Sequence, residues 1–252
     1  MSSELSRKEL KRPDVILVNL REGYHWVENN LKTLVWIAAV IFGAMVIWTV
    51  TNLYQDKKEG KALSAFYGAE KNVEKKRGEI LKGTKDKKKN TSDVLAALPQ
   101  ELFELKAVTQ KFPKSQAAFL AYLKLGELYS QEKKYTDALS FYEKALPLAH
   151  NKFYKILVTY NLGYLYELSQ DYPKAIEWYR KITEYKKQRI LLWTVGYRPN
   201  AFWIASAYFG LGRSYEKLKK VAEAKEMYLH VADEFPNTTF ADKGHAFAQL
   251  LN

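Results

Sequence analysis

The stretch YNLGYLYEL, residues 160–168, carries the pattern that decides the fold, because two other segments repeat it with the same internal spacing. These segments are YLKLGELY, residues 122–129, and YFGLGRSYEKL, residues 208–218. Each reads Leu-Gly-x-x-Tyr, each has an alanine twelve residues after the glycine, and each has a tyrosine sixteen residues after it. Three copies with identical spacing predict a repeated structural unit. The glycines are Gly126, Gly163 and Gly212, the alanines Ala138, Ala175 and Ala224, and the later tyrosines Tyr142, Tyr179 and Tyr228.

The physical reading of one copy is a pair of antiparallel helices. Apolar residues recur at helical spacing, so each helix presents one apolar face to the core. The small glycine and alanine mark the place where the two helices approach most closely, and a larger side chain there would force them apart. The composition agrees with this reading, because glycine (12) and proline (7) are scarce in 252 residues.

This pattern resembles the tetratricopeptide repeat, a unit of 34 residues with Leu-Gly-x-x-Tyr, alanine, aromatic and proline positions. The resemblance covers roughly residues 115–238 and implies three repeats in an all-α fold, a helical solenoid. Two spacings depart from the pattern: the glycines are 37 and then 49 residues apart. The second departure is an insertion of about fifteen residues between Tyr185 and Ala201.

The regions that flank the three repeats complete the solenoid. Residues 56–114 are expected to hold a linker helix and a degenerate repeat, whose two helices, 61–73 and 101–115, are joined by a basic loop. Residues 239–252 are expected to form a capping helix, because a solenoid needs an end unit that covers its last apolar face.

A membrane-spanning helix is predicted for residues 33–55, which hold no charged side chain. About 20 apolar residues suffice to cross a bilayer as a helix, and Trp36, Trp48 and Tyr54 lie towards the ends, where aromatic belts form. The run is too long for the apolar core of a cleaved signal peptide. Residues 1–32 then form a short tail, which we expect in the cytosol. Both flanks are basic, so the opposite orientation stays open.

The order of a short tail, one anchor and a repeat domain resembles an inner-membrane class of tetratricopeptide-repeat proteins that includes the ancillary subunit of the bacterial Sec translocon. The stretches 26–32 and 62–67 look similar to it. The resemblance implies a periplasmic repeat domain and a membrane-tethered adaptor for protein–protein interaction, chaperone-like at the export site. The alternative is a structural scaffold subunit of a larger envelope machine, such as a secretion or motility apparatus.

Positive charge is concentrated between the anchor and the repeats. The chain carries a net charge of +12, and residues 71–89 alone carry 9 basic and 3 acidic side chains. A basic run suits anionic lipid headgroups, so the region Lys75–Lys89 is a candidate for lipid contact, although a solvated helix end and loop is the favoured explanation. No aromatic side chain interrupts the run, which argues against nucleic acid.

Catalytic chemistry finds no support in the sequence. No cysteine is present, which excludes disulfides, thiolate nucleophiles and cysteine-ligated metals. The four histidines are scattered without metal-ligand spacing, and no phosphate-binding loop or nucleophile motif occurs. We therefore expect a protein that is not an enzyme, with no cofactor and no metal site.

Two surfaces are candidates for binding protein partners or peptide segments. The first helices of tetratricopeptide repeats line a concave groove, and the register of the motif assigns ten residues to it. The carboxylate-gripping clamp of chaperone-tail binders is missing, because Leu123, Glu127, Tyr160 and Phe209 stand at the matching positions. The other surface is the insertion 186–199, which either extends the flanking helices into the core or docks a partner. The groove residues are Leu120, Leu123, Glu127, Leu157, Tyr160, Tyr164, Glu167, Phe209, Arg213 and Glu216, and the insertion residues are Ile190, Leu192 and Trp193.

Overall fold

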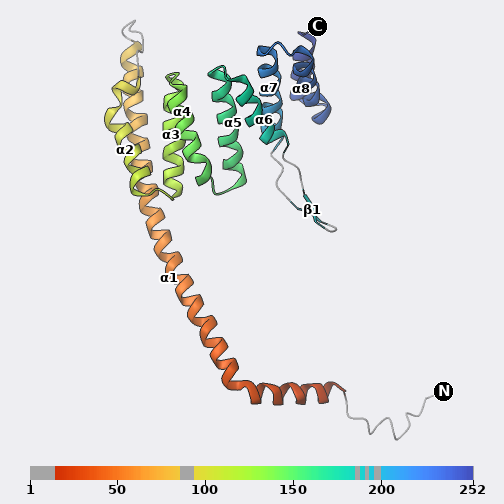
Figure 1. The fold of residues 1–252 in the computed structure, drawn as a ribbon. Coiled ribbons are helices and arrows are strands. Elements are labelled where there is room, and N and C mark those ends of the chain that lie inside the picture. Colours follow the sequence, from red (N-terminus) through yellow and green to blue (C-terminus); the bar gives the residue numbers. More distant parts are fainter. Residues whose placement is uncertain (1–14, 86–93, 185–187, 191–192, 196–199, 252) are drawn as a thin grey trace, which may run out of the picture. The chain divides into compact units, whose positions relative to one another are not determined.

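The computed structural model describes residues 15–85, 94–184, 188–190, 193–195 and 200–251 (Figure 1). The chain divides into two units, residues 1–58 and 59–252. Helix α1 (Val15–Lys85) runs through the boundary between them. Each unit is described by itself below.

The first unit is helical and keeps its apolar side chains on the outside. From Thr33 to Gln55 every residue except Leu34 and Gly43 is exposed, and Trp36 reaches 73%. Large apolar side chains without a protein partner need an apolar environment. The candidate span in this helix has a mean hydropathy of 2.3 and none of it is buried. By length and composition, α1 is able to cross a membrane.

The second unit is a row of helix pairs, and the expected solenoid is confirmed. The end of α1 packs against η1 (Val94–Ala97) and α2 (Pro99–Lys111) through a cluster that contains Phe66, Val73 and Leu105. The pairs that follow appear in chain order in Figure 1. They are α3 (Gln116–Gln131) with α4 (Tyr135–Ala145), α5 (Lys152–Leu168) with α6 (Tyr172–Thr183), and α7 (Ala201–Lys217) with α8 (Val221–Glu234). The short η2 (Leu146–Leu148) links α4 to α5, and α9 (Thr239–Gln249) packs on α8.

The first helix of the degenerate repeat differs from the expectation. The sequence predicts a separate helix over residues 61–73, but this stretch is an inner part of the 71-residue helix α1. No helix-breaking proline lies between the apolar stretch and Lys85, so backbone hydrogen bonding continues through both segments.

The glycine of each repeat receives the tyrosine ring of the paired helix. A Cβ atom built on Gly126 would lie 2.6 Å from Cε2 of Tyr142, and one on Gly163 would lie 3.0 Å from the ring of Tyr179. The alanines of the motif are fully buried in all three repeats. The small residues of the pattern therefore make room for a tyrosine, which is a more specific role than the helix approach that the sequence suggests.

The turn inside each pair is repeated as faithfully as the core. The residue seven positions after each motif glycine has a positive φ: Lys133 (59°), Gln170 (65°) and Lys219 (59°). The next residue donates its backbone N–H to the carbonyl of the motif tyrosine, for example Lys134 to Tyr129 at 2.9 Å. Such left-handed residues close helix ends by satisfying carbonyls that would otherwise lack a partner.

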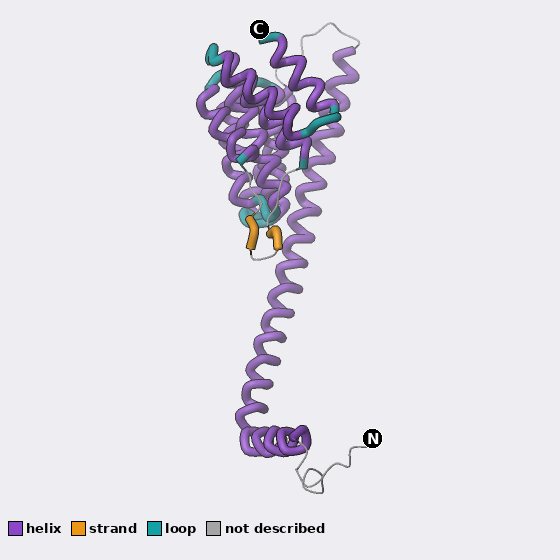
Figure 2. Tube along the Cα trace, turned by 90° about the vertical axis from the view of Figure 1, so that its right-hand side faces the viewer, coloured by secondary structure: helices purple, strands orange, loops and turns teal. Residues whose placement is uncertain are grey.

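The insertion between α6 and α7 adds the only strands among the described residues, β1 (Gln188–Ile190) and β2 (Trp193–Val195), drawn in orange in Figure 2. They pair antiparallel, with Ile190 opposite Trp193. The expectation that the insertion extends the flanking helices is therefore wrong. Its run of β-branched and aromatic residues favours a pleated ladder.

Candidate partner-binding site

The first helices of the pairs, α3, α5 and α7, carry all ten residues that the sequence assigns to the groove. They differ in how accessible they are. Tyr164 and Glu216 are exposed, whereas Phe209 is buried at 9%. The other seven are partly buried: Leu120, Leu123, Glu127, Leu157, Tyr160, Glu167 and Arg213.

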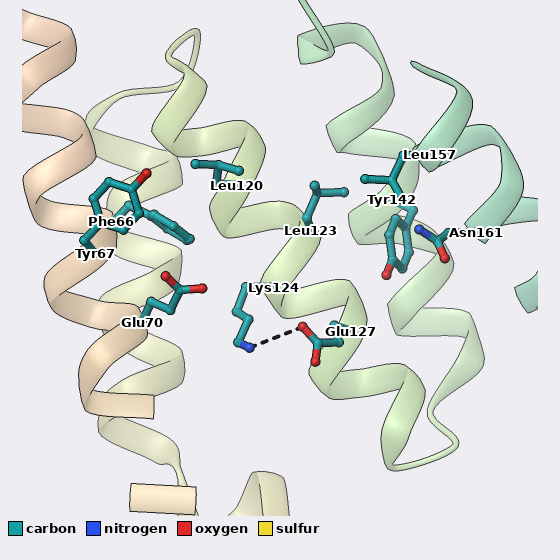
Figure 3. A pocket seen from close by; sticks show the side chains of 10 residues that line it. All are labelled: Phe66, Tyr67, Glu70, Leu120, Leu123, Lys124, Glu127, Tyr142, Leu157 and Asn161. Atoms are coloured by element: carbon teal, nitrogen blue, oxygen red, sulfur yellow. Dashed lines mark hydrogen bonds and ion pairs between the residues drawn. The ribbon is translucent and has the colours of Figure 1, made fainter. Parts of the chain in front are cut away.

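A cavity of about 340 Å³ opens where the end of α1 faces α3 and α5 (Figure 3). Its walls mix apolar side chains with a few polar groups. Four residues that the sequence assigns to the groove line it: Leu120, Leu123, Glu127 and Leu157. Phe66, Tyr67, Glu70, Lys124, Tyr142 and Asn161 complete the lining.

An ion pair forms part of the cavity wall. Lys124 Nζ lies 2.6 Å from a carboxylate oxygen of Glu74 and 3.2 Å from one of Glu127. The hydrogen bond from Lys124 lowers the pKa of Glu74. Burial by itself would lower the pKa of Lys124, but its bonds to the two carboxylates outweigh this and raise it. The pair therefore stays charged at neutral pH and joins α1 to α3.

Tyr142 presents a hydroxyl in the same cavity. Its side chain is only 7% exposed, and burial together with the nearby carboxylate of Glu127 raises its pKa to about 12. The hydroxyl is therefore neutral at neutral pH, and it can donate one hydrogen bond and accept others.

A second polar network joins the last two repeats. Arg213 on α7 donates two hydrogen bonds to Glu167 on α5, at 2.7 and 2.9 Å. Glu167 also accepts one from Tyr179 of α6 at 2.7 Å. Burial would lower the pKa of Arg213, but the paired carboxylate raises it. The sequence assigns Arg213 to the partner-binding groove, whereas in the structure its guanidinium is hydrogen-bonded within the chain.

Two further residues that the sequence assigns to the groove have side chains that pack inside the chain. The ring of Phe209 contacts those of Tyr228 and Phe247, so Phe209 belongs to the core under α9 and not to an open surface. Tyr160 packs against Tyr179 and Trp203, with ring centroids 5.7 and 5.4 Å apart. Glu216 accepts the hydroxyl of Tyr228. The groove is therefore most open beside α3 and the start of the repeats.

The insertion residues are only partly described. Ile190 and Trp193 lie in the paired strands, and Leu192 falls outside the described residues. Whether the insertion is a docking surface stays a prediction.

Of the basic region, Lys76 pairs with Glu79 at 3.7 Å and Arg77 with Glu74 at 3.6 Å. Lys87, Lys88 and Lys89 lie outside the described residues.

Several cavity residues were not assigned by the sequence. Glu70 belongs to a helix outside the recognisable repeats, and Lys124, Tyr142 and Asn161 occupy positions that the motif assigns to packing or leaves undefined. These residues can be recognised as parts of one cavity only when the packing of α1 against α3 is known.

Comparison with known proteins supports the repeat and little beyond it. Two family models of the tetratricopeptide repeat match the chain, at residues 117–188 and 206–238. No curated protein matches the chain. A solved structure, described as the crystal structure of BtubC (BKLC) from P. vanneervenii, is 15% identical, covers 78% of this chain and 82% of its own, and has a TM-score of 0.40. So weak a likeness says nothing about function.

The matched residues coincide with the helix pairs from α3 to α8. Residues 117–188 and 206–238 thus match tetratricopeptide repeats, and they follow a long N-terminal helix that is apolar enough, by length and composition, to span a membrane.

Proposed function

We propose that this chain is a membrane-tethered adaptor that binds protein partners through the concave side of its tetratricopeptide repeats. Such repeats are generally non-catalytic interaction modules, and the observation that carries the proposal is the open cavity beside α3. Its apolar walls include Leu120, Leu123 and Leu157, which are partly buried and lack a covering helix among the described residues. Apolar side chains at a concave surface with a few polar groups are typical of binding sites.

The tether is the apolar stretch of α1. Its exposed side chains and lack of charge support insertion as a single-pass helix in the bacterial inner membrane. The short N-terminal tail stays in the cytosol, and the repeat domain lies in the periplasm. An adaptor held there meets segments of proteins that leave the membrane, which is the chaperone-like role at the export site. Contact of the basic side chains between residues 75 and 89 with anionic lipid headgroups stays a prediction.

The test is recovery of partners from membranes solubilised in mild detergent. A variant with Leu123→Ser and Leu157→Ser alters the cavity walls, and Phe103→Ser makes a similar change at an exposed site on α2. The cavity variant is expected to lose about tenfold or more of its bound partner, because central apolar contacts dominate binding energy. The control is expected to keep it. Circular dichroism must show native helix content in both. Equal recovery from all three proteins would refute the proposal.

The scaffold alternative rests on a different feature, the β1–β2 hairpin. The two strands pair only with each other among the described residues, so the ladder has free backbone edges. A partner strand can add to such an edge. A scaffold predicts one stoichiometric complex that survives detergent and is lost when residues 186–199 are replaced by a short linker. An adaptor predicts that this replacement leaves partner recovery unchanged.

A further inference from the structure

The cavity beside α3 contains a break in the pattern of the repeats. In the second and third repeats, the tyrosine sixteen residues after the glycine donates its hydroxyl to the glutamate four residues after it: Tyr179 to Glu167 and Tyr228 to Glu216. In the first repeat Ser130 stands at that position. The shorter side chain makes no such bond, and the hydroxyl of Tyr142 has no hydrogen-bond partner among the described residues.

The side chain of Tyr142 has little room to rotate toward another hydrogen-bond partner. Its ring lies against Gly126, where a Cβ would be only 2.6 Å away, and its side chain is 7% exposed. The nearest carboxylate, that of Glu127, already accepts bonds from Lys124 at 3.2 Å and Gln131 at 3.0 Å. The hydroxyl itself is accessible to solvent, because no fully buried side-chain nitrogen or oxygen among the described residues lacks a hydrogen-bond partner. The hydroxyl lines the cavity, so a ligand there is able to supply one.

Two more polar side chains of the cavity have no partner among the described residues. These are the carboxylate of Glu70 on α1 and the amide of Asn161 on α5, and they lie on opposite sides of the cavity in Figure 3. Between them stand Leu120, Leu123 and Leu157. Hydrogen-bonding groups thus flank an apolar strip, as an extended peptide would need.

The charge of the cavity selects among peptides. The network around Lys124 contains the carboxylates of Glu74 and Glu127, and Arg77 lies 3.6 Å from Glu74. Two cations therefore balance two of the carboxylates, and Glu70 is the third, without a counter-ion. A guanidinium or ammonium group at Glu70 would complete the balance.

We propose that this cavity binds an extended, basic peptide segment, with an arginine or lysine side chain paired to Glu70 and the peptide backbone bonded to Tyr142 and Asn161. The proposal rests on the adaptor function above and names the chemistry of its partner. Apolar side chains of the segment cover Leu120, Leu123 and Leu157. An acidic segment is disfavoured, because it would bring a second unpaired carboxylate to Glu70.

The test uses the full chain in lipid nanodiscs and three fluorescent peptides. The probe alternates leucine with arginine, and its two counterparts carry glutamine or glutamate in place of every arginine. Affinities are measured by fluorescence anisotropy at one salt concentration. The arginine peptide is expected to bind about tenfold more tightly than the glutamine peptide, and the glutamate peptide most weakly.

Three variants locate the preference. Glu70→Gln is expected to remove most of the difference between the arginine and glutamine peptides. Glu177→Gln makes the same charge change at an exposed position of α6 outside the cavity. This variant is expected to keep the difference in affinity between the arginine and glutamine peptides. Tyr142→Phe keeps the ring over Gly126 and is expected to weaken both peptides by about three- to tenfold.

Three outcomes would overturn the proposal. If the arginine and glutamine peptides bind equally, and Leu123→Ser abolishes the binding of both, the adaptor function stands but the preference for basic peptides is refuted. If Glu70→Gln leaves the preference for the arginine peptide unchanged, the site that recognises arginine lies elsewhere on the molecule. If no peptide binds, the inference falls, and partner recovery from detergent decides the adaptor function separately.

Discussion

Arg213 of α7 grips Glu167 of α5 with two hydrogen bonds, at 2.7 and 2.9 Å, across the boundary between the second and third repeats. The side chain of Glu167 is 14% exposed, and that of Arg213 is 40% exposed. Both residues lie on first helices of successive repeats, at positions that the sequence assigns to the partner-binding groove. The geometry of the pair assigns it instead to holding successive repeats in register, together with Tyr179.

Removing one partner of this pair is expected to destabilise the second unit. Glu167→Gln removes the negative charge of the side chain that accepts hydrogen bonds from both Arg213 and Tyr179. The substitution should lower the free energy of unfolding by about 1–3 kcal/mol. Urea unfolding in mild detergent, followed by circular dichroism, measures it. With Arg213→Met as the second change, a double-mutant cycle should give a coupling of about 1 kcal/mol. Strictly additive effects would mean that the pair contributes no stability.

The close contact between Gly126 and Tyr142 predicts opposite results for one substitution at two sites. Gly126→Ala places a methyl group against the buried ring and should cost about 1–3 kcal/mol of stability. Gly68→Ala is the matched control: it lies inside α1 with nothing within 4 Å of the added atom, so alanine should be neutral or stabilise by up to ~1 kcal/mol. Thermal unfolding compares them. Equal melting temperatures would contradict the proposed packing of the repeats.

The ion pair between Glu74 and Lys124 predicts a pH dependence. The pKa of Glu74 is lowered below its ordinary 4.5, so the folded chain binds fewer protons there than the unfolded chain. Its stabilisation is complete above about pH 5 and is lost as the pH falls through the lowered pKa. Between about pH 5 and pH 3 the native chain should lose more stability than Lys124→Met, by up to ~1 kcal/mol because Glu74 is half exposed. Parallel pH profiles for the two proteins would rule this out.

The orientation of the anchor predicts where the C-terminus lies. A reporter that is active only after export, fused at Asn252, should be active, and a reporter that requires the cytosol should be inactive there. Removal of residues 33–55 should release the protein from membranes, because that stretch is the proposed anchor. The reverse pattern of reporter activity would place the repeats in the cytosol and exclude the export-site role.

How much the sequence predicts depends on how local each feature is. The helix pairs follow from Leu-Gly-x-x-Tyr and its alanine and tyrosine, because the motif glycine and the later tyrosine meet within one copy, as Gly126 and Tyr142 do. The bond between Arg213 and Glu167 does not, because it depends on how one unit is rotated against the next.

Two other features escaped the sequence for different reasons. Phe209 stands at a groove position of the motif but is covered by Phe247 of α9, which lies outside the three repeats. The hairpin was missed because its apolar run suits a helix extension and a strand equally well. By contrast, the sequence itself shows that Ser130 stands where the other two repeats have a glutamate. Its consequence for the hydroxyl of Tyr142 is seen only when the repeats are compared in the structure.

The central claim, that partners bind on the concave side beside α3, is tested most directly by photo-crosslinking in intact cells. A photoreactive amino acid at Leu123 or Leu157 lies in the cavity wall, and one at Glu177 lies on exposed α6. Binding in the groove predicts a crosslinked protein partner from Leu123 and Leu157, and none of that mass from Glu177. A partner that crosslinks from Glu177 and from neither leucine would contradict the account.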